Sequence, residues 1–171
     1  MSILSLNEVS LELAGKQLLD KASLQIQANE RMALVGRNGA GKSTLLQLLK
    51  GTLAPDSGII QLASGLRIAG LTQEIPVDGT IPVYDYLVSG LGETGEVLAK
   101  YRTYTLAGEL KKIADYQQKI DALNAWDFIP KIEAMASRLE FDFDAKMQAL
   151  SGGKKRQVLL AAALIAEPDL L

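Results

Sequence analysis

The sequence predicts an α/β fold with an antiparallel β subdomain and a helical subdomain. Three observations support this prediction. Alternating apolar residues occur near the N-terminus, a glycine-rich loop separates a short apolar run from a leucine-rich segment, and residues 92–139 follow the period of helices. The chain has 171 residues, of which 48% are hydrophobic, and a net charge of −2. It is therefore long and apolar enough to form a hydrophobic core.

The composition excludes several classes of site. The chain has no cysteine and no histidine, which excludes disulfides and zinc sites of the Cys/His kind. The first ten residues lack a basic start and an uninterrupted apolar run, and no segment approaches the roughly 20 apolar residues of a membrane span. We therefore expect no export signal, no membrane insertion and a cytoplasmic location. The near-neutral charge gives no electrostatic indication of nucleic acid binding.

The N-terminal elements are expected to be strands. Residues 4–13 and 23–27 alternate between apolar and polar, and Gly15-Lys16 between them is a plausible turn, so we expect an antiparallel hairpin. The apolar run within residues 31–35 predicts a strand that is buried on both faces. Two further short strands are expected at residues 59–62 and 66–71.

Helices are expected after the glycine-rich loop and in the second half of the chain. Leu45, Leu46, Leu48 and Leu49 mark one helix face, and Gly51 is suited to end that helix. Residues 92–139 predict a helical insertion, with a further helix that starts near Pro130. The last predicted helix runs from Gly152 or Gly153 to Ala166, and Pro168 prevents its continuation.

The strongest motif is the segment GRNGAGKS at residues 36–43, which matches G-x-x-x-x-G-K-S between a predicted strand and a predicted helix. Its glycines let the backbone wrap a phosphate, and the helix start adds a positive end. We expect Lys42 to reach the β- and γ-phosphates of a nucleotide and Ser43 to bind Mg²⁺. The alternative is a glycine turn at the end of a strand. The expected phosphate-binding residues are Gly36, Arg37, Asn38, Gly39, Ala40, Gly41, Lys42, Ser43 and Thr44.

A second motif, LSGGKKRQ, occupies residues 150–157. Taken alone it is ambiguous, because Ser151 followed by two glycines is also an ordinary helix start with a serine N-cap. The phosphate-binding motif at residues 36–43 favours a functional role for this second motif over a simple helix start.

Together these motifs resemble those of the ABC ATPases, which have the P-loop NTPase fold. Residues 36–43 resemble the Walker A motif, Gln73 resembles the glutamine of the Q-loop, and residues 150–157 resemble the ABC signature. Within this family the sequence is most similar to the ABC-F group, in particular to the N-terminal cassette of Uup-like proteins. This narrower resemblance rests on residues 35–45 and 84–87.

The resemblance implies that two cassettes together form each ATP site. Ser151, Gly152 and Gly153 would contact the ATP that is bound to an opposing cassette, which agrees with the affinity of helix N-termini for phosphate. Gln73 would bind Mg²⁺ together with Ser43, or position water. ATP and Mg²⁺ are thus the expected cofactors, and a second cassette is the expected partner.

The sequence departs from the family pattern at two places. Leu13 occupies the position where many cassettes have an aromatic residue against adenine, so an apolar contact and a weaker preference for adenine are expected. After Leu171 the family pattern would continue to the Walker B aspartate, a catalytic glutamate and the switch histidine. Glu167 and Asp169 do not take these positions. We therefore expect a truncated cassette with C-terminal sheet strands missing, no catalytic residue present, and little hydrolysis by this chain alone.

The expected domain is one partial cassette with three segments. Residues 1–75 form the antiparallel strands and the P-loop core, residues 76–150 form the helical subdomain with an arm-like insertion, and residues 151–171 form the signature helix. The resemblance implies an ABC-F protein that binds Mg-ATP and, when intact, hydrolyses it to drive cassette closure in translation on the ribosome, with ribosomal RNA as a further partner.

Two alternatives remain open, the ATPase subunit of a membrane ABC transporter and a non-catalytic nucleotide-binding regulatory module. Residues 92–127 hold five basic and six acidic side chains, so the insertion is not an electropositive stripe.

Two further groups of side chains have a structural interpretation and a functional one. The aromatic residues of the insertion are expected to pack between helices, although they could stack on bases. The basic run Lys154-Lys155-Arg156 is expected to be a solvated helical turn, although it could contact phosphate. The aromatic residues are Tyr101, Tyr104, Tyr116 and Trp126.

Overall fold

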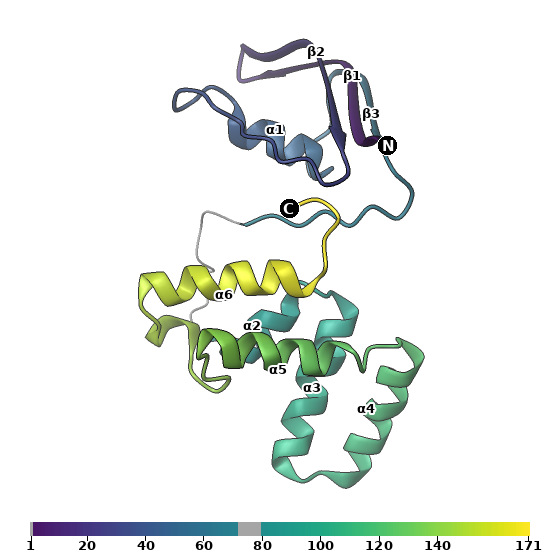
Figure 1. Ribbon diagram of the computed structural model, residues 1–171, viewed down its shortest axis with the longest axis vertical. Helices are drawn as coiled ribbons and strands as arrows, with labels where there is room; N and C mark the ends of the chain where they lie inside the picture. The colour runs from purple at the N-terminus through teal and green to yellow at the C-terminus, as the bar shows by residue number, and fades with distance from the viewer. Residues whose placement is uncertain (1, 72–79) are drawn as a thin grey trace. The chain divides into compact units, whose positions relative to one another are not determined.

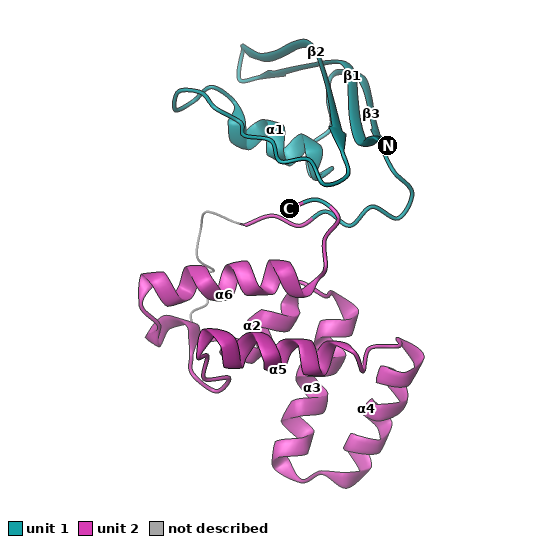
Figure 2. Cartoon of the chain, in the orientation of Figure 1, with its two compact units in different colours: residues 1–68, 170 teal, residues 69–169, 171 magenta. Residues whose placement is uncertain are grey.

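A computed structural model describes residues 2–71 and 80–171 of the chain. The chain divides into two compact units (Figure 2). Unit 1 comprises residues 1–68 and Leu170, and unit 2 comprises residues 69–169 and Leu171. Gln73, the residue expected in the Q-loop, lies outside the described residues.

Unit 1 is a three-stranded antiparallel sheet with one helix (Figure 1). The strand order is β2-β1-β3, and both neighbours of β1 run antiparallel to it. Ala14 and Gly15 both have positive φ, as the two central residues of a tight hairpin turn require, and the predicted hairpin is confirmed. The elements are β1 (Ser2–Leu13), β2 (Lys16–Gln27), α1 (Lys42–Leu49) and β3 (Ser57–Leu62).

The core of unit 1 joins the sheet to the helix. Leu4, Leu6 and Val9 of β1 are buried together with Ile26 of β2 and Leu49 of α1. Burial of the apolar side chains is the main source of stability for such a small sheet. It also fixes α1, whose first residues form the site described below.

Two strand predictions in unit 1 are wrong. Residues 31–35 have no strand conformation, and their apolar side chains are exposed, with Val35 89% accessible. A strand needs a hydrogen-bonded neighbour, and no strand of the described part of the chain pairs with this segment. Residues 66–71 contribute only an isolated parallel bridge between Ile68 and Leu170.

Unit 2 is helical. Its elements are α2 (Val83–Ser89), α3 (Glu93–Ala107), α4 (Leu110–Ala122), α5 (Phe128–Leu139), the 3₁₀ turn η1 (Met147–Ala149) and α6 (Gly152–Ile165). Each α-helix contributes a fully buried side chain to one core. These side chains are Leu87, Leu98, Ile120, Ile132 and Val158. The helices predicted between residues 92 and 166 are confirmed, whereas α2 lies in the expected helical subdomain without having been predicted as a separate helix.

The aromatic residues of the insertion pack against each other. α3 and α4 form a helical hairpin (Figure 1), across which the ring centroids of Tyr104 and Tyr116 lie 5.2 Å apart. Tyr101 of α3 meets Trp126 edge to face at 5.7 Å. The structural interpretation of these rings is therefore confirmed.

Candidate phosphate-binding site

The glycine-rich loop turns directly into α1. Gly39 and Gly41 have φ values of 78° and 89°. Residues other than glycine rarely adopt this left-handed backbone conformation. The amide of Ala40 donates to the carbonyl of Arg37 at 3.1 Å and closes a turn inside the loop. The amide of Leu45 donates to Gly41 at 2.9 Å and starts the helix. The two glycines thus allow the backbone to wrap around the site that the motif predicts.

The loop also packs against β2. A Cβ atom placed on Gly41 would lie 3.6 Å from the Cβ atom of Leu18, which is ordinary van der Waals contact. A Cβ atom on Gly36 would lie 3.4 Å from the Cβ atom of Ala40. A Cβ atom would therefore fit at either position, and it is the positive φ of Gly41 that favours glycine there.

The N-terminus of α1 presents uncapped amide groups. Gly41 at the N-cap position has no side chain to accept a hydrogen bond. The amides of Lys42, Ser43 and Thr44 precede the first amide that donates within the helix, so the helix itself gives them no acceptor. Amides in this position, together with the helix dipole, favour an anion.

The Lys42 side chain folds over its own loop. Its Nζ atom donates to the carbonyl oxygens of Gly36 at 2.7 Å and Arg37 at 2.9 Å. No carboxylate of the described residues forms an ion pair with Lys42, so its charge is not neutralised there. An ammonium group, helix amides and a curved backbone therefore meet at one place.

Lys16 is a site residue that no sequence motif indicated. It opens β2 at the tip of the β1–β2 hairpin, and its Nζ atom lies 3.4 Å from the carbonyl oxygen of Gly39. Leu13, the residue expected near adenine, is 41% exposed and pairs with Lys16 across the hairpin. The hairpin tip and the glycine loop are thus neighbours, and only the fold reveals this.

The donor groups of the loop fit a phosphate chain with Mg²⁺. Backbone amides and an ammonium group suit phosphate oxygens, and the exposed hydroxyl of Ser43 is the hard oxygen ligand that Mg²⁺ prefers. The described residues contain no cluster of three or more acidic, histidine or cysteine side chains that could hold a metal. Among them, an Mg²⁺ ion would therefore rely on Ser43 together with phosphate oxygens and water.

The second motif forms the start of α6. Ser151 is the N-cap residue, and its Oγ atom accepts a hydrogen bond from the amide of Lys154 at 3.3 Å, which confirms the predicted helix start. Gly152 and Gly153 are exposed, and a Cβ atom added to either would meet nothing within 4 Å. This helix end is open to a ligand or a partner.

Lys154 is not a solvated residue of the first turn, and that prediction is wrong for it. Its Nζ atom donates to the carbonyl oxygen of Leu139 at 2.7 Å and lies 5.7 Å from the ring centre of Phe141. Leu139 is the last residue of α5, whose terminal carbonyls have no donor within the helix. The lysine satisfies one of them.

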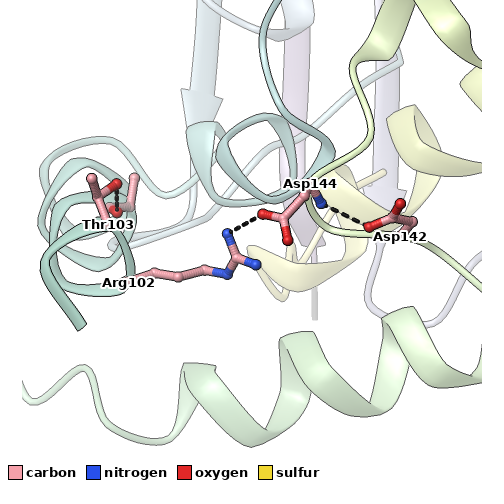
Figure 3. A network of polar contacts seen from close by, with 5 residues as sticks. Arg102, Thr103, Asp142 and Asp144 are labelled. Atoms are coloured by element: carbon pink, nitrogen blue, oxygen red, sulfur yellow. Dashed lines mark hydrogen bonds and ion pairs between the residues drawn. The ribbon is translucent and has the colours of Figure 1, made fainter. Parts of the chain in front are cut away.

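Arg102 of α3 holds the segment that leads to the second motif (Figure 3). Its guanidinium donates to Asp144 at 3.0 Å, and the amide of Asp144 donates to Asp142 at 3.0 Å. The same guanidinium lies 4.9 Å from the ring centre of Tyr84 and 5.3 Å from that of Phe143. Burial raises the pKa of Tyr84 to about 12, although the nearby Arg102 opposes the rise.

The comparisons with known sequences agree with these motifs. The protein-family model described as ABC transporter matches residues 19–171. The ATP-binding protein Uup of Haemophilus influenzae is 35% identical over 100% of this chain, and its counterpart in Escherichia coli is 34% identical. The energy-dependent translational throttle protein EttA of Mycobacterium tuberculosis is 30% identical over 99% of the chain. The chain spans 28% of the length of both Uup proteins and 32% of EttA.

Solved structures show the fold. The ATP-binding cassette MJ1267 of an ABC transporter has a TM-score of 0.68 at 21% identity, over 98% of this chain and 66% of that one. A nucleotide-free ATP-binding cassette from an ABC transporter has a TM-score of 0.65 at 20% identity with the same coverage. The predicted fold class is therefore confirmed. No described helix is long and apolar enough to cross a membrane.

Proposed function

This chain belongs to the ABC transporter family of ATPase cassettes, and we propose that it binds Mg-ATP on the loop of residues 36–44. The observation that carries the proposal is the position of Lys42. It is the first residue of α1, and its ammonium donates hydrogen bonds to the carbonyl oxygens of Gly36 and Arg37. Positive charge, helix amides and left-handed glycines thus converge where a chain of phosphates carries the complementary charge.

Each part of the loop has a distinct role in this proposal. The backbone amides of Gly39 and of residues 41–44 donate to phosphate oxygens, while the amide of Ala40 keeps its hydrogen bond to Arg37. Lys42 exchanges its two carbonyl acceptors for oxygens of the β- and γ-phosphates, which are stronger acceptors because they are charged. Ser43 holds Mg²⁺, with Gln73 as the expected further ligand, and bound Mg²⁺ neutralises charge on the phosphates.

For the intact protein we propose an ABC-F ATPase with a second cassette. Ser151, Gly152 and Gly153 would then contact the nucleotide of that second cassette. Their exposure at the start of α6 supports this role, because nothing within the described residues fills the space in front of the two glycines. Hydrolysis would drive closure of the two cassettes.

Translation in the cytoplasm, with the ribosome as partner, is the proposed setting. The similarity to the translational throttle protein EttA supports it. The α3–α4 hairpin supports it as well, since it stands where an arm-like insertion of the first cassette is expected.

Calorimetric titration of this chain with Mg-ATP tests the central proposal. We expect the unsubstituted chain to bind, Lys42→Ala to lose at least about tenfold in affinity, and Lys50→Ala to bind normally. Lys50 lies at the opposite end of the same helix, so it controls for loss of charge on α1. Equal affinity of Lys42→Ala and Lys50→Ala, or no binding by the folded chain, would overturn the proposal.

A further inference from the structure

We propose that Lys16 is a second cation of the nucleotide site and pairs with the phosphate chain beside Lys42. This inference rests on the proposed function and adds a residue that lies outside the glycine-rich motif. It starts from the contact between the Lys16 ammonium and the carbonyl of Gly39 in the middle of the loop.

Two contacts orient β2 toward the loop. Lys16 and Leu18 are two positions apart in β2, and Leu18 is an extra residue of this strand, because the register shifts between the pairs Glu12–Gln17 and Leu11–Leu19. The Leu18 side chain lies 3.6 Å from where a Cβ atom of Gly41 would be, and the Lys16 ammonium donates to the carbonyl of Gly39. The start of β2 thus lies against the loop at two residues, Gly39 and Gly41. The place of Lys16 beside the loop is therefore supported by the neighbouring contact of Leu18 as well as by its own hydrogen bond.

The hairpin fixes the backbone of Lys16 but leaves its side chain adaptable. The two-residue turn at Ala14 and Gly15 places Lys16 directly opposite Leu13. The residue itself is exposed, and its four-carbon side chain can move the ammonium by several ångströms without moving the strand.

The charge of Lys16 is available to a nucleotide. Within the described residues no carboxylate forms an ion pair with it, and its hydrogen bond to the neutral Gly39 carbonyl is long at 3.4 Å. A phosphate oxygen is a stronger acceptor because both partners are then charged. Binding of a nucleotide should therefore draw the ammonium from the carbonyl to a phosphate.

This arrangement also bears on specificity. Leu13 has no aromatic ring to stack on a base, whereas its cross-strand partner Lys16 brings a charge. Affinity should therefore depend on phosphate charge and ionic strength more than on the identity of the base.

The test is calorimetric titration of the whole chain with Mg-ATP at low and at high salt. We expect Lys16→Ala and Lys16→Gln to raise Kd about five- to tenfold at low salt, and this difference to shrink at high salt. Lys16→Arg should bind as the unsubstituted chain does. Lys21→Ala, which removes another exposed lysine of β2, should leave Kd unchanged.

The variants separate this inference from the proposed function. If Lys16→Ala and Lys16→Gln bind like Lys21→Ala at both salt concentrations while Lys42→Ala is weakened, the role of Lys16 is wrong and the proposed function stands. If the folded, unsubstituted chain does not bind Mg-ATP, both are wrong. Circular dichroism of each variant establishes that the comparison is made between folded proteins.

Discussion

The ammonium of Lys154 lies 2.7 Å from the carbonyl oxygen of Leu139, so the first turn of α6 caps the C-terminal end of α5. The two residues are 15 positions apart in the sequence. Because Lys154 directly follows Gly153, this hydrogen bond also orients the exposed helix start that is proposed to meet a second cassette.

Removal of this cap should destabilise unit 2. We expect Lys154→Ala to lower the free energy of unfolding by about 1 kcal/mol, because a helix carbonyl loses a charged donor. Denaturation followed by fluorescence measures this directly, since the only tryptophan of the chain, Trp126, lies in unit 2. Lys155→Ala is the control and should change stability little. Equal effects of the two substitutions would show that the cap contributes nothing.

Arg102 should stabilise unit 2 through its shape as well as its charge. We expect Arg102→Ala to lower the free energy of unfolding by roughly 1 to 2 kcal/mol, because an ion pair and two ring contacts are lost. Arg102→Lys should recover only part of this loss, since an ammonium cannot stack as a planar guanidinium does. The same fluorescence experiment applies, and full recovery by lysine would contradict the role of the rings.

Tyr84 should make unit 2 sensitive to alkaline pH. Its pKa of about 12 lies above the ordinary value of 10.0, so the folded state holds the phenol proton more tightly than the unfolded state does. This contribution to stability, at most roughly 3 kcal/mol, is complete below pH 10 and is lost as the pH rises through 12. Urea denaturation at several pH values measures it. If Tyr84→Phe loses the same amount of stability as the pH is raised, the effect comes from other groups.

Gly58 should be essential to unit 1. It has a φ of 88°, and an added Cβ atom would lie 2.5 Å from the backbone oxygen of Glu8. We expect Gly58→Ala to displace β3 from β1 and to accelerate amide hydrogen exchange in β1. Gly15→Ala is a matched control, because Gly15 also has positive φ but open space around it, and should cost only about 1 kcal/mol of backbone strain. Normal exchange in Gly58→Ala would refute the predicted clash.

Local signals predicted the features that depend on neighbouring residues. Gly41 followed by Lys42 indicated the start of α1, and Ser151 indicated the start of α6, because loop conformation and helix capping are decided within a few residues. A turn was predicted at Gly15-Lys16 for the same reason, and the observed turn lies one residue earlier, at Ala14 and Gly15.

Features that depend on distant residues could not be predicted. Residues 31–35 have the composition of a buried strand, but strand formation requires a partner, and none of the described strands pairs with them. Lys16 reaches a loop residue 23 positions away, and Arg102 reaches Asp144 42 positions away. No periodicity or motif encodes such contacts, which arise only when the chain has folded.

Hydrogen exchange of the backbone amides with and without Mg-ATP tests the central claim most directly, since the amides themselves are proposed to donate to phosphate. The account predicts slower exchange of Gly39 and of residues 41–44 on addition of Mg-ATP, and no such protection in Lys42→Ala. Unchanged exchange of these amides at saturating nucleotide, or protection confined to unit 2, would contradict the assignment of the loop as the nucleotide site.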